Sequence, residues 1–111
     1  MREDRRRLED ILEAISQIEK YATRGRQAFE SDEMLQVWMV YHFQIMGEAA
    51  NGLSPALQAS TPTIPWSDVI GMRNILIHRY WGIDPDIIWA AVEDALPSFK
   101  KQLQALLTTL K

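Results

Sequence analysis

Apolar residues recur every three or four positions along most of this chain, which is the spacing of helices that bury one face. The first such segment runs from about residue 5 to residue 24, and Gly25 is expected to end it. Its apolar positions are Leu8, Ile11, Leu12, Ile15, Ile18 and Ala22. Charged residues fill most of the intervening positions, so we expect an amphipathic helix.

A second helix is expected to begin at Ser31 or Asp32, either of which can cap it, and to run to about Asn51. Its apolar positions are Met34, Leu35, Val37, Trp38, Met39, Val40, Tyr41, Phe43, Ile45 and Met46. These residues surround the helix almost completely, which excludes a surface helix with a single buried side. We therefore expect the helix to be covered on several sides, by its own bundle or by a second subunit as well.

The stretch that follows Gly52, residues 53–65, contains three of the five prolines of the chain. It predicts a loop with one short helical turn near residues 55–58. Pro65 suits the first turn of a third helix, because its fixed backbone angle is compatible with a helix start. The buried stripe of this third helix is expected to consist of Val69, Met72, Ile75 and Leu76.

Trp81-Gly82 is expected to end the third helix, because glycine can adopt the left-handed conformation found at helix ends. Asp84 can cap the last helix, and Pro85 suits its first position. Its apolar positions are Ile88, Val92, Ala95, Leu96, Phe99, Leu103, Leu106 and Leu110. Pro97 lies inside this pattern and lacks a backbone donor, which predicts a kink near residues 95–97.

No strand-like alternation appears, so we expect an all-α bundle of four main helices that forms a single domain over residues 1–111. Cysteine is absent, which excludes disulfides and cysteine-ligated zinc and is compatible with a reducing cytoplasm. No apolar run approaches the roughly 18 residues that a membrane span needs. The charged N-terminus is not a secretory signal. We therefore expect a cytoplasmic protein that does not enter a membrane.

The formal net charge is −3, from 12 basic and 15 acidic residues, so no global field attracts nucleic acid. Any positive potential must therefore be local. The pair Arg73 and Arg79 is one source. The other source is an N-terminal cluster, for which we expect a solvated helix face: Arg2, Arg5, Arg6 and Arg7.

Residues 73–80, RNILIHRY, contain the side chains best suited to catalysis or to binding a ligand. An arginine can hold a phosphate through a planar fork of donors, and a neutral imidazole can move a proton near pH 7. Arg73 and His78 are therefore candidates for RNA cleavage that needs no metal. The alternative is an ordinary amphipathic helix with polar residues toward water. On an ideal helix Asn74 and His78 share a face, whereas Arg73 and His78 point about 140° apart.

The order Arg73, four residues, His78, one residue, Tyr80 resembles the R-x4-H-x-Y motif of HepT-like toxins. These toxins belong to the HEPN superfamily of small α-helical proteins, many of which are metal-independent ribonucleases. The resemblance covers essentially the whole chain, because further segments look like family segments in the family's order. These are residues 8–12 (LEDIL), 45–50 (IMGEAA), 64–66 (IPW), 71–74 (GMRN) and 81–84 (WGID).

The resemblance implies an endoribonuclease toxin that works as a two-fold dimer and needs no metal or cofactor. His78 would act as general acid or base, and Arg73 would bind the scissile phosphate and stabilise the charge of the transition state. Asn74 would orient the substrate or His78. The family is typically paired with a small nucleotidyltransferase antitoxin that adenylylates the tyrosine of the motif, here Tyr80. Added phosphate charge beside the arginine and histidine would then exclude RNA.

Other interpretations remain open from the sequence. The bundle could be a non-catalytic module that binds a nucleotide or the phosphate of a nucleotidyltransferase partner. A di-metal carboxylate bundle is disfavoured because it needs Glu-x-x-His pairs, and Met39 and Ile75 stand at the positions where the glutamates would be. His42 is expected to be a hydrogen-bonded structural histidine. Glu48 could contact backbone or a third-helix side chain, in a structural or a site-supporting role. The tryptophans are expected to be core or interface anchors: Trp38, Trp66, Trp81 and Trp89.

Overall fold

The computed structural model describes residues 2–78 and 84–110, with Ile77 and His78 described by their backbone only. Within these residues all regular secondary structure is helical. The elements are α1 (Arg2–Ala22), α2 (Gly25–Ser31), α3 (Glu33–Asn51), α4 (Pro55–Ser60), α5 (Trp66–His78), α6 (Pro85–Ala90), the π-helical segment η2 (Ala91–Ala95) and α7 (Leu96–Thr109). The all-α prediction is confirmed. In this part of the chain no helix combines the length and the apolarity that crossing a membrane requires.

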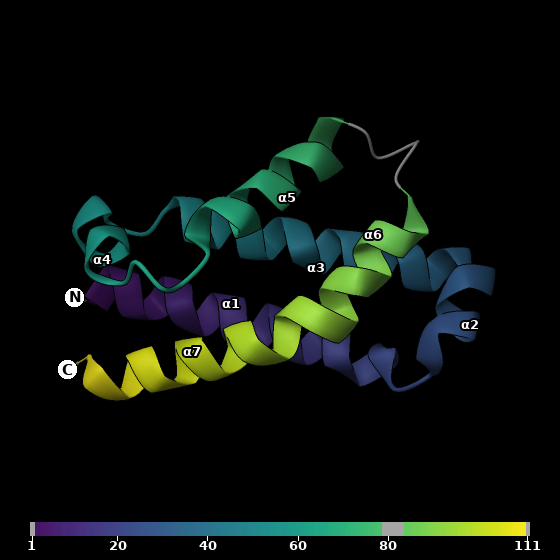
Figure 1. Ribbon diagram of the computed structural model, residues 1–111, viewed down its shortest axis with the longest axis horizontal. Helices are drawn as coiled ribbons and strands as arrows, with labels where there is room; N and C mark the ends of the chain where they lie inside the picture. Colours follow the sequence, from purple (N-terminus) through teal and green to yellow (C-terminus); the bar gives the residue numbers. More distant parts are fainter. Residues whose placement is uncertain (1, 79–83, 111) are drawn as a thin grey trace.

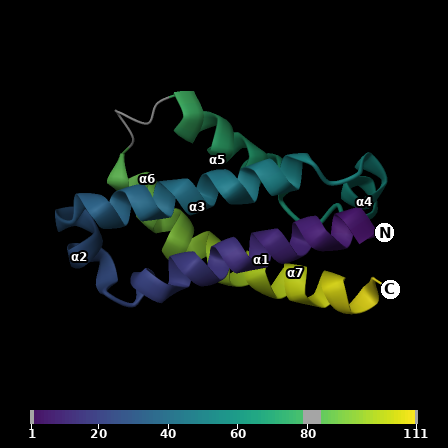
Figure 2. The same cartoon turned by 180° about the vertical axis from the view of Figure 1, so that it is seen from behind.

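Three long helices, α1, α3 and α7, lie along the long axis of the molecule, and α5 crosses α3 at an angle (Figures 1 and 2). The start of α1 and the end of α7 lie at the same end, where Arg5 donates to the carbonyl of Leu110 at 3.3 Å. The apolar face of α1 is buried as predicted, with these residues fully covered: Leu8, Ile11, Ile15 and Ile18. Helix α3 packs against both α1 and α5 and is therefore the central element of the fold.

The helix α2 was not expected from the sequence. α1 ends at Ala22, and Gly25 begins α2 with a φ of +88°, so the glycine reverses the chain rather than ending a helix that reaches it. Phe29 anchors α2 by packing on Trp89, with ring centroids 5.5 Å apart. A seven-residue helix with one buried side chain has no periodic pattern, which is why the sequence did not indicate it.

Several predicted helix ends are confirmed by the capping contacts of the structure. Asp32 accepts from the backbone N–H of Met34 at 2.9 Å at the start of α3, and Asp84 accepts from that of Asp86 at 2.9 Å at the start of α6. The predicted kink before Pro97 takes the form of η2, in which the N–H of Leu96 donates to the carbonyl of Ala91. A π-helical turn accommodates the missing donor of the proline without ending the helix.

One face of α3 is left uncovered by the described part of the chain, whereas the sequence led us to expect cover on several sides, by the bundle or by a second subunit as well. Met34, Val37 and Tyr41 are 75%, 58% and 56% exposed and follow one another at helical spacing. In α5 the stripe is also narrower than predicted. Leu76 is buried, but Ile75 is 50% exposed because α5 packs on α3 through its other side.

Helix α5 lies very close to α3 at Gly47. A Cβ atom built on Gly47 would lie 2.1 Å from the Cβ of Arg73 and 3.3 Å from the carbonyl oxygen of Val69. A distance near 2 Å is far inside van der Waals contact, so only glycine permits this crossing. Gly47 therefore fixes how near the backbone of Arg73 lies to α3.

Replacing Gly47 with alanine should destabilise the protein by about 1–3 kcal/mol, because α5 must move away from α3. Gly71 is a matched control in α5, since a Cβ there has no neighbour within 4 Å. Gly71→Ala should instead stabilise by about 0.5–1 kcal/mol through helix propensity. Chemical denaturation of both variants measures the difference, and equal effects at the two positions would contradict the packing argument.

Candidate functional site

Arg73 reaches from α5 onto α3, where its guanidinium is held by two neighbours. Its Nε donates to Oε1 of Glu48 at 2.8 Å, and its Nη2 donates to the same oxygen. Its Nη1 donates to Oδ1 of Asn74 at 2.9 Å. The side chain remains 24% exposed, so the group is neither sealed in the core nor freely mobile in solvent. Arg73 is thus a partly exposed cation with a defined orientation.

Glu48 was not predicted to hold Arg73, although a contact with a third-helix side chain was one of the alternatives considered for it. The two residues are 25 positions apart in sequence. Gly47 immediately precedes Glu48 and brings α5 close enough for this contact. In the sequence the pair is marked only by a small residue before an acidic one in one helix and by an arginine in another. Many helices contain such residues, so the sequence does not identify the pair.

His78 is the last residue of α5, and its side chain lies outside the described residues. Because α5 is α-helical from Arg73 to His78, the Cβ directions of the two residues differ by about 140° on an ideal helix. The backbone therefore provides no distortion that would turn both residues to one side within a single chain. Tyr80 and Arg79 also lie outside the described residues.

Asn74 is exposed and lies beside Arg73, with its amide oxygen accepting from that guanidinium. Its role is thus tied to the arginine in the described structure, whereas the sequence led us to expect an effect on the substrate or on His78. The amide nitrogen of Asn74 can still donate to another group, since a side-chain amide has both functions.

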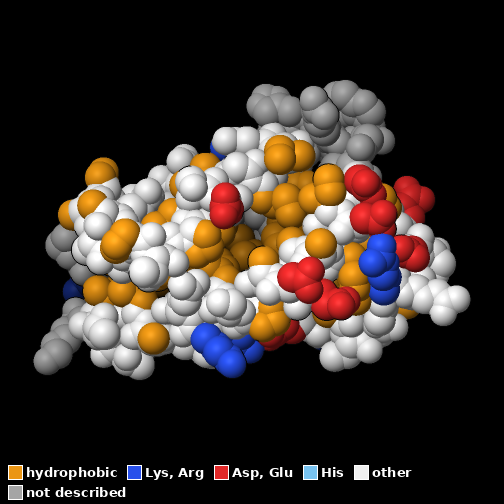
Figure 3. Space-filling view, viewed as in Figure 1, with side chains coloured by type: hydrophobic (Ala, Val, Ile, Leu, Met, Phe, Trp, Pro, Cys, Tyr) orange, Lys and Arg blue, Asp and Glu red, His pale blue; other side chains and the backbone are white. Residues whose placement is uncertain are grey.

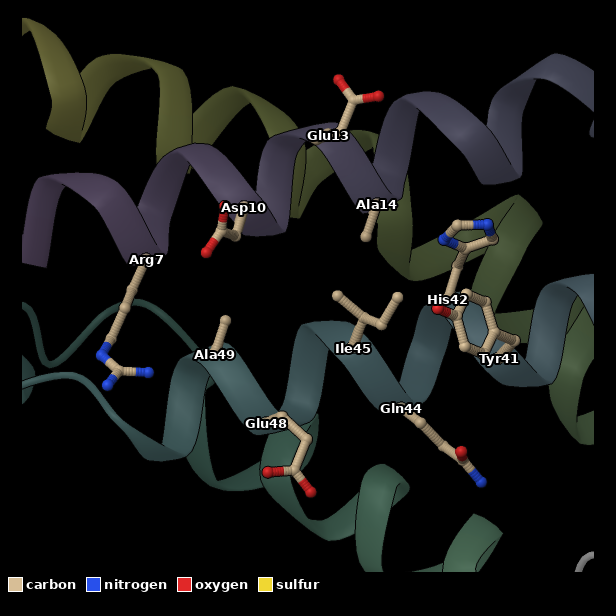
Figure 4. Close-up of a pocket in the computed structure, with 10 residues that line it drawn as sticks. All are labelled: Arg7, Asp10, Glu13, Ala14, Tyr41, His42, Gln44, Ile45, Glu48 and Ala49. Atoms are coloured by element: carbon tan, nitrogen blue, oxygen red, sulfur yellow. The ribbon is translucent and has the colours of Figure 1, made fainter.

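A groove with a volume of about 470 Å³ runs between α1 and α3, and Glu48, the partner of Arg73, is one of its lining residues (Figure 4). Arg7 enters it from α1, and Glu48 lies at its edge, pointing away from α1. Asp10 and Glu13 also line the groove. Their carboxylates would repel a phosphate, so the electrostatics disfavour this groove as the path of a nucleic acid.

His42 is buried, 7% exposed, in the wall of the same groove. Its ring makes edge contacts with those of Trp38 and Tyr41, at centroid distances of 4.6 and 5.0 Å. Within the described residues neither ring nitrogen has a hydrogen-bond partner, so the prediction of a hydrogen-bonded histidine is wrong, although its burial is confirmed. Burial lowers the pKa of His42, while the charge of Glu13 acts in the opposite direction. His42 is therefore neutral near pH 7.

Another hollow, of about 400 Å³, opens between α5 and the segment η2–α7, over α3. Apolar side chains gather there in the middle of the face shown in Figure 3, and Met46, Met72 and Phe99 are among its lining residues. Among the described residues, its lining includes no cation that could hold a phosphate. No group of three or more His, Cys, Asp or Glu residues suited to a metal ion occurs in residues 2–76 and 84–110.

The other predicted residues are placed as follows. Arg2, Arg5 and Arg6 are exposed, as predicted for a solvated face of α1, but Arg7 is half-buried and lines the groove between α1 and α3. Trp66 and Trp89 are buried core residues, as expected. Trp38 packs at the edge of the core, and its Nε1 donates to the carbonyl of Gln17 at 2.8 Å. Trp81 lies outside the described residues.

Comparison with known proteins gives consistent matches over nearly the whole chain. A family model described as "Ribonuclease HepT-like" matches residues 11–106. "Probable ribonuclease HepT" of Thermococcus cleftensis is 34% identical over 100 residues, which are 89% of this chain and 91% of that protein. "Putative RNase MJ1380" of Methanocaldococcus jannaschii is 31% identical over 98 residues, 87% of this chain and 90% of that protein. No solved structure matches the chain.

Proposed function

Because this chain belongs to the HepT-like ribonuclease family, we propose that it is a metal-independent endoribonuclease and the toxin of a toxin–antitoxin pair. The observation that carries the proposal is Arg73, a partly exposed guanidinium with a fixed orientation, five residues before His78. A fixed cation of this kind can bind a phosphate and stabilise the negative charge that grows during its displacement. The relatives' names, which say ribonuclease or RNase, support the same activity.

In the proposed reaction the 2′-hydroxyl of the RNA attacks the adjacent phosphorus, and the bond to the 5′-oxygen of the next nucleotide breaks. His78 takes the proton of the 2′-hydroxyl while water protonates the leaving 5′-oxygen, or His78 protonates that oxygen while water takes the proton of the 2′-hydroxyl. Arg73 binds the scissile phosphate throughout this step. Asn74 keeps Arg73 in place through its amide oxygen.

We propose that the active form is a homodimer in which the two copies complete the site. On an ideal helix the Cβ directions of Arg73 and His78 differ by about 140°, so we expect a residue of a second copy to be needed to bring both groups to one phosphate. The uncovered face of α3 offers a surface for this association: Met34, Val37 and Tyr41. Large apolar side chains that lie exposed in a row typically mark a protein interface.

We also propose that the partner is a minimal nucleotidyltransferase antitoxin that adenylylates Tyr80. The tyrosine is two residues after His78 in the sequence. Transfer of AMP would form a bond between the tyrosine oxygen and the α-phosphorus of ATP and release pyrophosphate. The added phosphate charge and bulk would then compete with RNA for Arg73.

The ribonuclease activity is tested by incubating the purified, unmodified protein with RNA and EDTA. We expect cleavage that the chelator does not abolish. Its rate should fall at least about 100-fold in Arg73→Ala, which loses the stabilisation of the transition-state charge, and in His78→Ala, which loses the proton transfer. Arg6→Ala is the matched control, because Arg6 is an exposed arginine on α1. Intact RNA in every reaction, with retained binding of a nucleotide or of the nucleotidyltransferase, would favour the non-catalytic binding module instead.

The dimer is tested by introducing a charge into the uncovered face of α3. Val37→Glu should convert the protein to a monomer in sedimentation or light-scattering measurements and should reduce RNA cleavage with it, because a carboxylate cannot be buried unpaired in an apolar interface. Ala105→Glu is the matched control, since Ala105 is exposed on α7, which packs against α1 and η2. A wild-type protein that is monomeric at its active concentration would refute the proposed association.

Adenylylation is tested by measuring the intact mass of the protein after co-expression with its nucleotidyltransferase. The mass should rise by AMP in the wild type and not in Tyr80→Phe. Tyr41→Phe, which changes an exposed tyrosine on α3, should still be modified. An unchanged wild-type mass, or modification that persists in Tyr80→Phe, would contradict the proposed mode of inhibition.

A further inference from the structure

Glu48 and Arg73 form a contact whose geometry has a consequence for catalysis. A guanidinium has five N–H donors. Glu48 accepts one from Nε and one from Nη2, and Asn74 accepts one from Nη1. Within the described residues this leaves one donor on Nη1 and one on Nη2, at the outer end of the side chain. Those two can still bind a phosphate that approaches from solvent.

We propose that Glu48 is the positioning residue of Arg73 in the proposed ribonuclease, on which this inference rests. Its carboxylate takes the edge of the guanidinium nearest the backbone and thereby directs the outer edge to the phosphate. Glu48 itself does not touch the substrate. Because its side chain is 58% exposed, water screens its charge, and its effect on Arg73 is mainly one of orientation.

Two consecutive residues of α3 therefore determine where the arginine lies. Gly47 sets the base of the side chain, because its missing Cβ lets the Cβ of Arg73 rest against α3. Glu48 sets the tip, through two hydrogen bonds to one oxygen. A long side chain anchored at both its base and its tip loses little rotamer freedom when substrate binds, which favours the transition state.

If Glu48 instead inhibited the enzyme by neutralising Arg73, the expected result would be different. If Glu48 mainly neutralised Arg73, removing the carboxylate would strengthen RNA binding and raise activity, because the cation would regain its full field. If Glu48 positions Arg73, its removal lowers kcat more than it changes KM, because a mobile arginine still attracts RNA but stabilises the transition state less.

The test compares Glu48→Ala and Glu48→Gln in the full-length protein, with thermal unfolding to verify folding. Glu48→Ala should lower kcat by on the order of 10- to 100-fold with little change in KM. Glu48→Gln should retain more activity, since its amide oxygen can still accept from Arg73. The loss should not add to that of Arg73→Ala in the double variant. Higher activity or tighter RNA binding in either variant would overturn the positioning role.

A matched control and an RNA-independent measurement separate this inference from the proposed function. Glu19 pairs with Lys100 at 2.9 Å and likewise joins two helices, so Glu19→Gln should leave kcat unchanged. In an NMR spectrum, the Nε–H signal of Arg73, assigned by its loss in Arg73→Lys, should be protected from exchange with water in the wild type and in Glu19→Gln. It should lose that protection in Glu48→Ala.

The outcomes are distinguishable. A wild-type protein that leaves RNA intact would contradict the proposed ribonuclease activity. The NMR signal would then test only whether Glu48 binds Arg73. A wild-type protein that cuts RNA, together with an equally active Glu48→Ala variant, defeats the positioning role alone. An Nε–H signal that is unchanged in Glu48→Ala also defeats it.

Discussion

The close crossing of α5 over α3 at Gly47 is the constraint on which the candidate site depends. α3 is buried on the sides that face α1 and α5, and the glycine lets the base of Arg73 lie directly on it. Glu48, the next residue, is then within hydrogen-bonding distance of the guanidinium. A larger residue at position 47 would separate the helices and remove the arginine from its partner, so packing and chemistry are set by the same contact.

Periodicity and capping chemistry predicted most of the helices, because both depend on residues that are near in sequence. The buried face of α1, the caps Asp32 and Asp84 and the irregular turn before Pro97 all follow from local rules. The helix α2 did not follow, since its formation relies on the long-range contact of Phe29 with Trp89. The apolar circumference of α3 indicated that the helix must be covered, but hydrophobicity does not specify by which surface.

The candidate site likewise has a part that the sequence identified and a part that it did not. Arg73 and His78 could be identified in the sequence because they lie in one short motif, and the matches to HepT-like proteins agree with that assignment of the family. The partner of Arg73 could not be identified, because Glu48 is 25 residues away and the contact depends on how two helices cross. His42 illustrates the converse: its burial followed from the apolar helix around it, but the absence of a hydrogen-bond partner among the described residues did not.

The charge distribution explains why orientation must matter more than attraction in this protein. The net charge is −3, the groove beside the site carries Asp10 and Glu13, and the cation itself is paired with a carboxylate. Such a surface attracts a polyanion weakly, because non-specific binding to nucleic acid grows with the number of unpaired cations. In the proposed reaction, catalysis would depend instead on interactions that strengthen in the transition state, and two directed N–H groups on a fixed guanidinium would provide these. A homodimer would present two such groups, so association of the copies would add to the affinity for RNA without requiring a basic surface.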